Sequence, residues 1–238
     1  MIVIKNRSVR SIIRIVVPFF VIPALALFGS IAFDRKKHII ISLAAAFFAL
    51  MVFISGFEKK SVGTRRLVIT AVMTALCFIG RFIPFLKPIT ALTIITALYL
   101  GGESGFLVGA MTAILSNIYF GHGPWTAFQM LAWGLIGLIA GFLSEPLKRN
   151  KLLLLIYGAA AGIAYSFIMD IWTVLWYNNG FDTRLYLSAL VTAIPYTLSY
   201  MISNILFLTV LAKPFGEKLD VSKSNTGYKE CISAPFAF

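Results

Sequence analysis

The chain has 238 residues, of which 59% are hydrophobic and 13% are charged, and its formal net charge is +12. Its mean hydropathy of +0.89 excludes a soluble globular domain, because so apolar a chain has too few polar side chains to cover a surface in water. The positive charge does not indicate nucleic-acid binding, since the basic residues gather between apolar blocks, where they set membrane orientation and meet anionic lipid.

Long apolar blocks predict membrane-spanning helices, because about 20 residues in a helix cross a ~30 Å hydrocarbon core. The block 152–177 lacks the polar–apolar alternation of barrel strands, which favours an all-α integral membrane protein. Two spans are predicted first, Ile12–Phe33 and Ile39–Phe57, and a charged linker follows them. The further predicted spans are Leu67–Phe85, Ile89–Leu100, Ser104–Phe120, Trp125–Leu143, Leu152–Tyr177 and Leu185–Leu211.

This pattern divides the chain into an N-terminal two-helix hairpin with a basic linker (1–65), a six-helix core (66–218) and a polar tail (219–238). The distribution of Lys and Arg predicts that both termini and both ends of the core are cytoplasmic. The basic cluster Arg35–Lys37 argues against the first hairpin as drawn. The loops then predicted to face outside are Pro84–Thr90, Gly121–Pro124 and Asn178–Arg184.

Polar side chains inside spans are costly and often mark function. Asp170 lies in the middle of a predicted span. It is either a functional carboxyl or a structural one paired with a neighbouring helix, and Arg81 is a possible partner by charge. Four further polar residues are each either a ligand contact or an interhelical hydrogen bond, the second being the commoner case: Asn117, Gln129, Tyr200 and Asn204.

The segment Phe120–Met130 begins with a Gly-His-Gly-Pro turn and continues as a helix rich in aromatic residues. His122 lies in the turn, and Trp125, Gln129 and Trp133 recur at helical spacing. Two large aromatic rings, an amide and an imidazole at an outer mouth suit a flat, partly polar organic ligand. The alternative is an interfacial aromatic belt, which needs no ligand.

Several pairs of small residues stand four positions apart, which lets helices approach closely. These pairs lie in Ala71/Ala75, Gly101/Gly105/Gly109 and Gly137/Gly141, and helix packing is the first explanation for each. The chain lacks a phosphate-binding loop and the signatures of zinc proteases and serine hydrolases. We therefore expect no catalytic residues, no bound metal, no cofactor and no ATP hydrolysis by the chain itself.

Residues 66–218 resemble the substrate-binding S component of energy-coupling factor (ECF) vitamin transporters. Ala71 and Ala75 stand in the first core helix, where that family carries its Ala-x-x-x-Ala motif for docking to the transmembrane coupling subunit. The resemblance implies a subunit that binds a vitamin from outside and then associates with the coupling subunit and two ATPases. It implies ligand contacts from His122, Trp125, Gln129, Trp133, Asp170 and Asn204. The segment Gly-His-Gly-Pro-Trp-Thr-x-Phe-Gln-Met is similar to a subgroup associated with cobalamin or corrinoid precursors.

Two other classes of function compete with this interpretation. A self-sufficient secondary transporter would use Asp170 as an ion or proton carrier, and paired interrupted helices in two repeated halves would favour it. A membrane enzyme or assembly factor would need clustered acids or histidines, and the chain has only two histidines.

Overall fold

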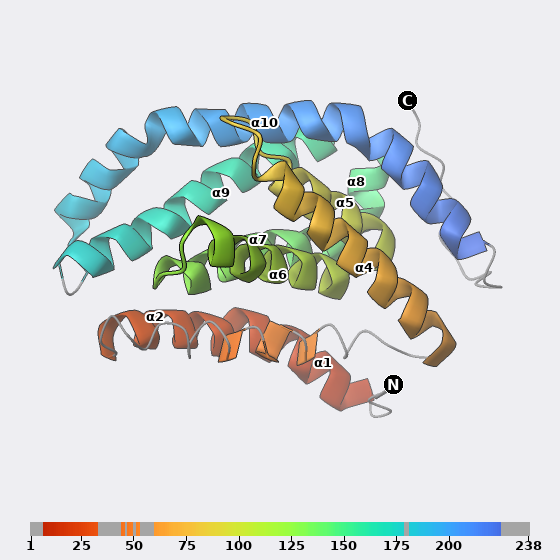
Figure 1. The fold of residues 1–238 in the computed structure, drawn as a ribbon, viewed down its shortest axis with the longest axis horizontal. Coiled ribbons are helices and arrows are strands. Elements are labelled where there is room, and N and C mark those ends of the chain that lie inside the picture. The colour runs from red at the N-terminus through yellow and green to blue at the C-terminus, as the bar shows by residue number, and fades with distance from the viewer. Residues whose placement is uncertain are drawn as a thin grey trace.

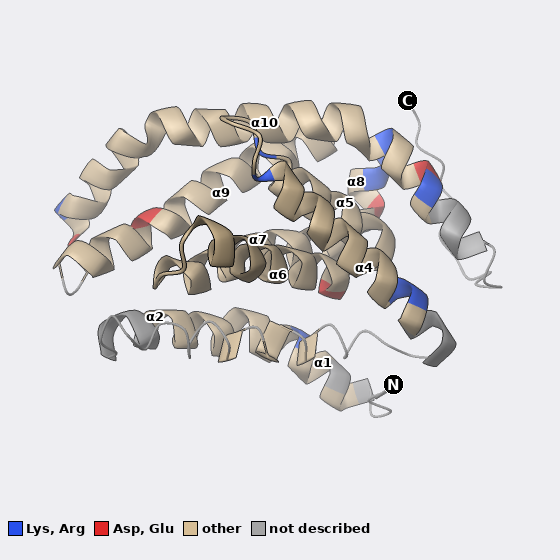
Figure 2. Ribbon diagram, viewed as in Figure 1, with Lys and Arg blue, Asp and Glu red and all other residues tan. Residues whose placement is uncertain are grey.

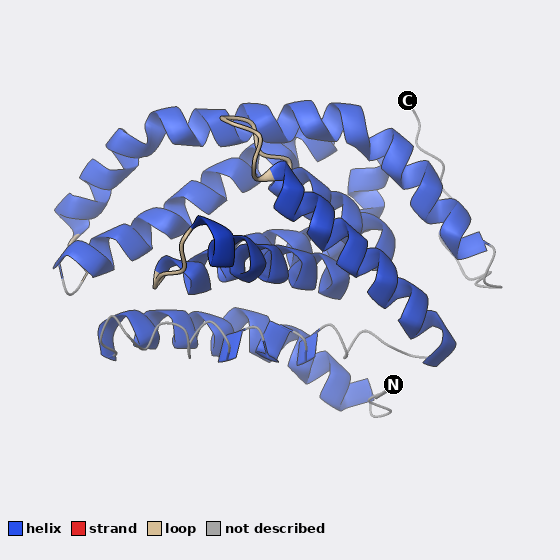
Figure 3. Ribbon diagram, viewed as in Figure 1, coloured by secondary structure: helices blue, strands red, loops and turns tan. Residues whose placement is uncertain are grey.

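The computed structural model describes residues 7–32, 44–45, 47–49, 51–52, 60–178 and 181–224. Every element in these ranges is helical (Figure 3). The fold class predicted from the apolar blocks is therefore confirmed as all-helical for the described part of the chain. Of the second predicted span, Ile39–Phe57, only short helical pieces within 44–52 are described. The Arg35–Lys37 cluster lies outside the described residues.

The core helices follow the predicted spans closely. They are α4 (Lys60–Gly80), α5 (Ile89–Leu100), α6 (Gly102–Phe120), α7 (Trp125–Phe142), α9 (Lys151–Asn178) and α10 (Thr183–Ser224), with the short α8 (Ser144–Arg149) between α7 and α9. Three boundaries differ from the prediction by more than two residues. The helix α4 ends at Gly80, before the predicted Phe85. The helix α4 begins inside the charged linker, and α10 continues past Leu211, so the first part of the predicted polar tail is helical.

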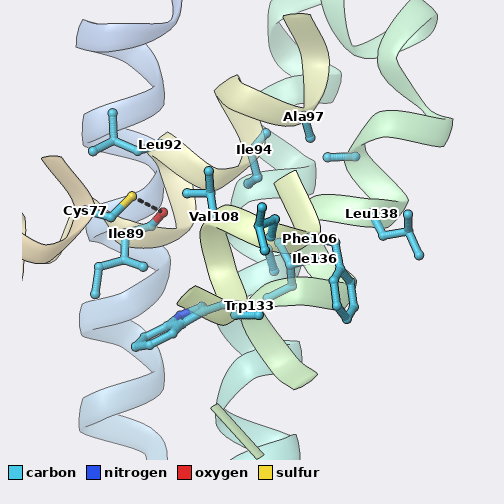
Figure 4. Close-up of a cluster of buried hydrophobic side chains, with 14 of the residues drawn as sticks. Cys77, Ile89, Leu92, Ile94, Ala97, Phe106, Val108, Trp133, Ile136 and Leu138 are labelled. Carbon is cyan, nitrogen blue, oxygen red and sulfur yellow. Dashed lines mark hydrogen bonds between the residues drawn. The ribbon is translucent and has the colours of Figure 1, made fainter. Parts of the chain in front are cut away.

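The helix α5 is the centre of the bundle, since each of its residues from Ile89 to Tyr99 is buried. Residues Phe106 and Val108 of α6 and Leu138 of α7 pack around it, as Figure 4 shows. The Cys77 thiol of α4 lies 3.7 Å from the carbonyl oxygen of Ile89 and belongs to the same cluster. The twelve residues of α5 make a helix only about 18 Å long. Because nearly all of its side chains are buried, α5 is an interior element of the bundle.

Glycines bring α6 and α7 into direct backbone contact. A Cβ atom at Gly105 would lie 3.1 Å from the Cα atom of Gly137, and one at Gly109 would lie 2.5 Å from the carbonyl carbon of Trp133. A Cβ atom at Gly141 would lie 2.2 Å from the Cα atom of Gly102. The predicted packing role is confirmed for Gly105, Gly109, Gly137 and Gly141, because no larger side chain fits between the two helices. A Cβ atom at Gly101 would instead meet the side chains of Glu103 and Arg66.

The helices α9 and α10 form a long antiparallel hairpin (Figure 1). Their contact is close because Gly158 and Gly162 leave room for Leu208 and for the backbone of Met201. Pro195 lies inside α10, and Pro214 lies near its end. Each proline removes a backbone donor from the helix ladder, and Figure 1 shows α10 bowed over the core.

The N-terminal helix is one run made of α1 (Arg7–Val16), the π-helical turn η1 (Val17–Val21) and α2 (Ile22–Ala32). Pro18 cannot donate to the helix ladder, and the N–H of Ile22 bonds to the carbonyl of Val17, five residues back. The run crosses one side of the core beside α6 and α7 (Figure 1). At its α2 end, Ala26 packs with Ala127, Phe128 and Leu175 in a small buried cluster.

A buried carboxylate connects the α1 end of this run to the core. Glu103, at the start of α6, forms ion pairs with Arg14 of α1 and, at 3.0 Å, with Arg66 of α4. Arg66 also donates from Nε to the Ser104 hydroxyl over 2.5 Å. One acidic side chain therefore joins three helices, because each of its two carboxylate oxygens pairs with a different arginine.

Charged residues gather at the helix ends, and the middle of the bundle is almost free of them (Figure 2). Three of the described helices are long and apolar enough to cross a bilayer: Trp125–Phe142, Lys151–Asn178 and Thr183–Leu219. The segments Ser11–Leu27 and Ile89–Leu100 are apolar but shorter. The number of spans and the cytoplasmic position of both termini stay predictions.

Candidate functional site

The site lies where α4 and α6 end and α7 begins, an end that we call the mouth. Loop 81–88 is close to the end of α6, because the Phe82 ring centroid lies 5.0 Å from those of Tyr119 and Phe120. Two serines of α10 hold the loop: Ser199 donates to the Phe85 carbonyl over 2.7 Å, and Ser203 donates to the Lys87 carbonyl over 2.9 Å. The loop therefore has a fixed position relative to α6 and α10.

Arg81 is the first residue after α4, and its half-buried side chain reaches into the mouth. Its Nη1 donates to Asn117 Oδ1 over 2.6 Å and also to the Ser116 hydroxyl. The guanidinium carbon lies 5.1 Å from the Phe120 ring centroid and 5.7 Å from that of Trp133, within the range of cation–π attraction. Arg81 is thus bound to α6, and the partnership with Asp170 suggested by charge alone is wrong.

A chain of buried amides and hydroxyls continues from Arg81 toward α9. Asn117 Nδ2 donates to Thr126 Oγ1 and to Gln129 Oε1, each over 2.8 Å. Gln129 Nε2 then donates to the Tyr165 hydroxyl over 3.3 Å. Because Asn117, Gln129 and Tyr165 are buried and mutually bonded, the chain holds its donors and acceptors in fixed directions.

Aromatic rings line the same place. Trp133 of α7 and Tyr165 of α9 stack with centroids 5.0 Å apart and an angle of 11° between their planes. Tyr200 of α10 meets Tyr165 edge-on at 4.8 Å. The mouth therefore combines aromatic rings, two of which are buried and stack on each other, with a line of polar groups. Rings and polar groups together are what a flat ligand with hydrogen-bonding edges requires.

Of the predicted site residues, Gln129 and Trp133 come together around Arg81, whereas Trp125 belongs to a neighbouring cluster. The ring centroids of Trp125 and Trp172 lie 5.6 Å apart, and Trp176 stacks on Trp172 at 6.2 Å. His122 is half-buried in the loop 121–124 that precedes Trp125. His122 lies just before α7 and Trp125 is its first residue, so both are one turn or more before Gln129.

Asp170 and Asn204 occupy different surroundings. The Asp170 side chain is buried in α9, and its Oδ2 atom has no hydrogen-bond partner among the described residues. Asn204 Nδ2 donates to the carbonyl of Gly158 over 2.9 Å, which is a contact between α10 and α9. The amide nitrogen of Asn204 therefore takes part in helix packing, the interhelical alternative that its position left open.

The structure adds Ser116, Thr126 and Tyr165 to the residues identified from sequence. Tyr165 carried a usable signal, because it is a polar aromatic residue inside an apolar span and lies on the same face of α9 as Gly158 and Gly162. Ser116 and Thr126 carried none, since each is a small hydroxyl residue of a kind common in membrane helices.

A sequence profile described as "ECF-type riboflavin transporter, S component" matches residues 61–219, which is more than half of the chain. The chain belongs to this family. The comparisons of this chain with curated proteins and with solved structures gave no match. The matched range includes every residue of the mouth, and the N-terminal helix precedes it.

Membership of the S-component family confirms the family resemblance drawn from the core helices. It does not support the narrower likeness to cobalamin-binding S components, because the matched profile is of the riboflavin type. Ala71 and Ala75 both lie on the exposed face of α4, beside Val68, Val72 and Ile79, which are also exposed. In this S component the Ala71/Ala75 pair is thus free of internal packing, unlike the glycine stripes of α6 and α7.

Proposed function

We propose that this S component binds riboflavin, or a vitamin with a similar flat heteroaromatic ring, at the mouth. The observation that carries the proposal is the stacked Trp133–Tyr165 pair beside the polar chain of Arg81, Asn117 and Gln129. A fused ring system presents large apolar faces and a polar edge, and these rings and amides complement both. The riboflavin-type family profile supports the same substrate class.

Gln129 and Trp133 are the proposed contacts to the ring, and His122, Trp125 and Asp170 are proposed contacts nearer the entrance. Asn204 contributes through the α9–α10 packing that positions Tyr200 one turn away. A corrinoid, the substrate expected from the Gly-His-Gly-Pro-Trp segment, has no support from the family profile.

The binding test is a titration of riboflavin into the purified full-length protein in detergent, followed by quenching of flavin fluorescence. We expect saturable one-to-one binding that excess cobalamin does not reverse. Mass spectrometry of small molecules that co-purify with the protein is an independent readout. Displacement of riboflavin by cobalamin, or co-purification of a corrinoid alone, would contradict the proposed substrate.

We further propose that import requires a transmembrane coupling subunit and two ATPase subunits, as for ECF transporters in general. The absence of a phosphate-binding loop supports an energy source outside this chain. The exposed Ala71/Ala75 face of α4 is the proposed docking surface, because small side chains allow a partner helix to approach closely.

Asp170 supports the alternative of a self-sufficient transporter, since its buried Oδ2 lacks a described partner. Uptake into liposomes by the chain alone would favour that alternative.

A further inference from the structure

Arg81 is an unusual cation for a membrane protein because its charge is only partly compensated. Its described hydrogen-bond acceptors are the neutral groups of Ser116 and Asn117, and both bonds come from Nη1. The ion pairs of the described chain join Glu103 or Glu145 to other arginines, and none includes Arg81. Within the same described ranges, Nε and Nη2 of Arg81 donate to no protein acceptor.

The surroundings hold this guanidinium in place without accepting hydrogen bonds from all of its N–H groups. Phe120 and Trp133 present their ring faces to it, and the loop that carries it is bonded to α10 through Ser199 and Ser203. Lys87 of the same loop adds a second positive charge, and partial burial, followed by the charge of Arg81, lowers the pKa of Lys87. An acceptor oxygen brought to Arg81 by a ligand would therefore meet a preorganised donor in a region without a described competing carboxylate.

We infer that Arg81 is a specificity-determining residue whose free N–H groups bind the carbonyl edge of the flat ring at the mouth. This inference rests on the proposed function and names the edge of the ligand that the site recognises. Trp133 both stacks on Tyr165 and lies within 5.7 Å of the Arg81 guanidinium carbon. A flat ring bound beside this aromatic cluster would have one of its in-plane carbonyls within reach of the guanidinium. The flavin ring carries two such carbonyls, at positions 2 and 4.

The test uses Arg81→Met in the full chain, because methionine keeps an apolar stem between Phe120 and Trp133 while it removes every donor. Charge-assisted hydrogen bonds are strong, so the variant should bind riboflavin roughly 10- to 100-fold more weakly. Arg184→Met is the matched control, since Arg184 is exposed at the start of α10 and lies outside the site. It should bind riboflavin within about twofold of the unmodified protein.

A second measurement separates recognition from a structural role. Riboflavin analogues in which sulfur replaces the oxygen at position 2 or position 4 keep the ring shape but have a weaker acceptor. The unmodified protein should discriminate against at least one analogue, and Arg81→Met should lose that discrimination. If Arg81→Met does not fold, Arg81→Lys replaces it in this measurement. Lysine keeps the positive charge but lacks the planar guanidinium, so Arg81→Lys should also lose the discrimination between riboflavin and its sulfur analogues.

Equal riboflavin affinity in Arg81→Met and Arg184→Met would overturn the inference. So would a variant that loses affinity for riboflavin and both analogues by the same factor, because Arg81 would then act only on the fold of the mouth. If unmodified protein binds riboflavin but fails to discriminate between the oxygen and sulfur compounds, the inference fails and the proposed function stands. If unmodified protein binds no flavin, both fail.

Discussion

At the scale of single residues, Gln129 is the junction of the mouth. Its oxygen accepts from Asn117, and its nitrogen donates to Tyr165, so it connects the end of α6 with α9. Trp125 has a different position, because its ring packs on Trp172 at the beginning of α7. The two residues therefore should not contribute equally to ligand binding, although their helical spacing suggests a single face.

We predict that Gln129→Ala weakens riboflavin binding by about tenfold or more, since it removes the central amide of the polar chain and takes one hydrogen bond each from Asn117 and Tyr165. Trp125→Ala should have a smaller effect, because it removes a contact with Trp172 nearer the entrance. Fluorescence titration of each variant measures the difference. A larger loss for Trp125→Ala than for Gln129→Ala would place the ring near Trp172 instead.

The residue scale is also where sequence reasoning is weakest. Gln129 and Trp133 could be predicted, because one helix carries both at helical spacing and a turn signal precedes them. The partners of Arg81 could not be predicted. Charge alone favours Asp170, whereas the actual acceptors, Ser116 and Asn117, depend on how α4 crosses α6. Such crossings are set by packing between distant segments and leave no local pattern in the sequence.

At the scale of elements, the helices are predicted from sequence much better than the partners of single residues, and the reason is physical. Apolar blocks interrupted by Gly, Pro and charged residues define helix ends locally, and the predicted Ile89–Leu100 has the same bounds as α5. The largest errors occur where polar residues continue a helix, at the start of α4 and the end of α10. A further error is the end of α4 at Gly80, since the apolar residues up to Phe85 were included in the predicted span. Lysine and glutamate are good helix formers, so a polar stretch marks the end of a span but not the end of a helix.

The helices also differ in how they use small residues, and this difference predicts a functional consequence. The exposed Ala71 on α4 contrasts with the glycines buried between α6 and α7. We predict that Ala71→Arg abolishes vitamin uptake by the assembled transporter while riboflavin affinity of the isolated subunit changes by less than about threefold. The measurements are uptake into cells that express the coupling module and a titration of the purified variant.

The matched control for this prediction is Ala164→Arg, which adds the same side chain to an exposed position of α9. We expect this control to support uptake, because it lies on a different helix from the proposed docking surface. Normal uptake by Ala71→Arg, or equal loss in both variants, would remove Ala71 from the docking surface.

At the scale of the whole molecule, the N-terminal helix is an addition to a core that is complete at the mouth. Each residue of the polar chain and of the aromatic stack lies after residue 60, within the range that matches the family. The N-terminal helix contacts this core through Ala26 at one end and Arg14 at the other. It supplies no described residue of the candidate site, and we expect its contacts to stabilise the core.

We predict that a variant lacking residues 1–59 binds riboflavin with an affinity close to that of the full chain but melts at a lower temperature. Arg14→Gln should produce a smaller loss, about 1–4 °C, because it removes one half-exposed ion pair. Thermal unfolding with and without riboflavin measures both effects. A folded deletion variant that no longer binds riboflavin would show that the N-terminal helix is part of the site.

The shared carboxylate of Glu103 has a consequence for the biogenesis of the protein. Arg14 is translated before Glu103, and α4 and α5 lie between them in the chain. A buried carboxylate such as Glu103 is costly without cations beside it, and Arg14 supplies one of its two partners. The contact between Arg14 and the core can therefore form only once α6 has been made, so this contact is established after the helices that lie between its two partners in the chain.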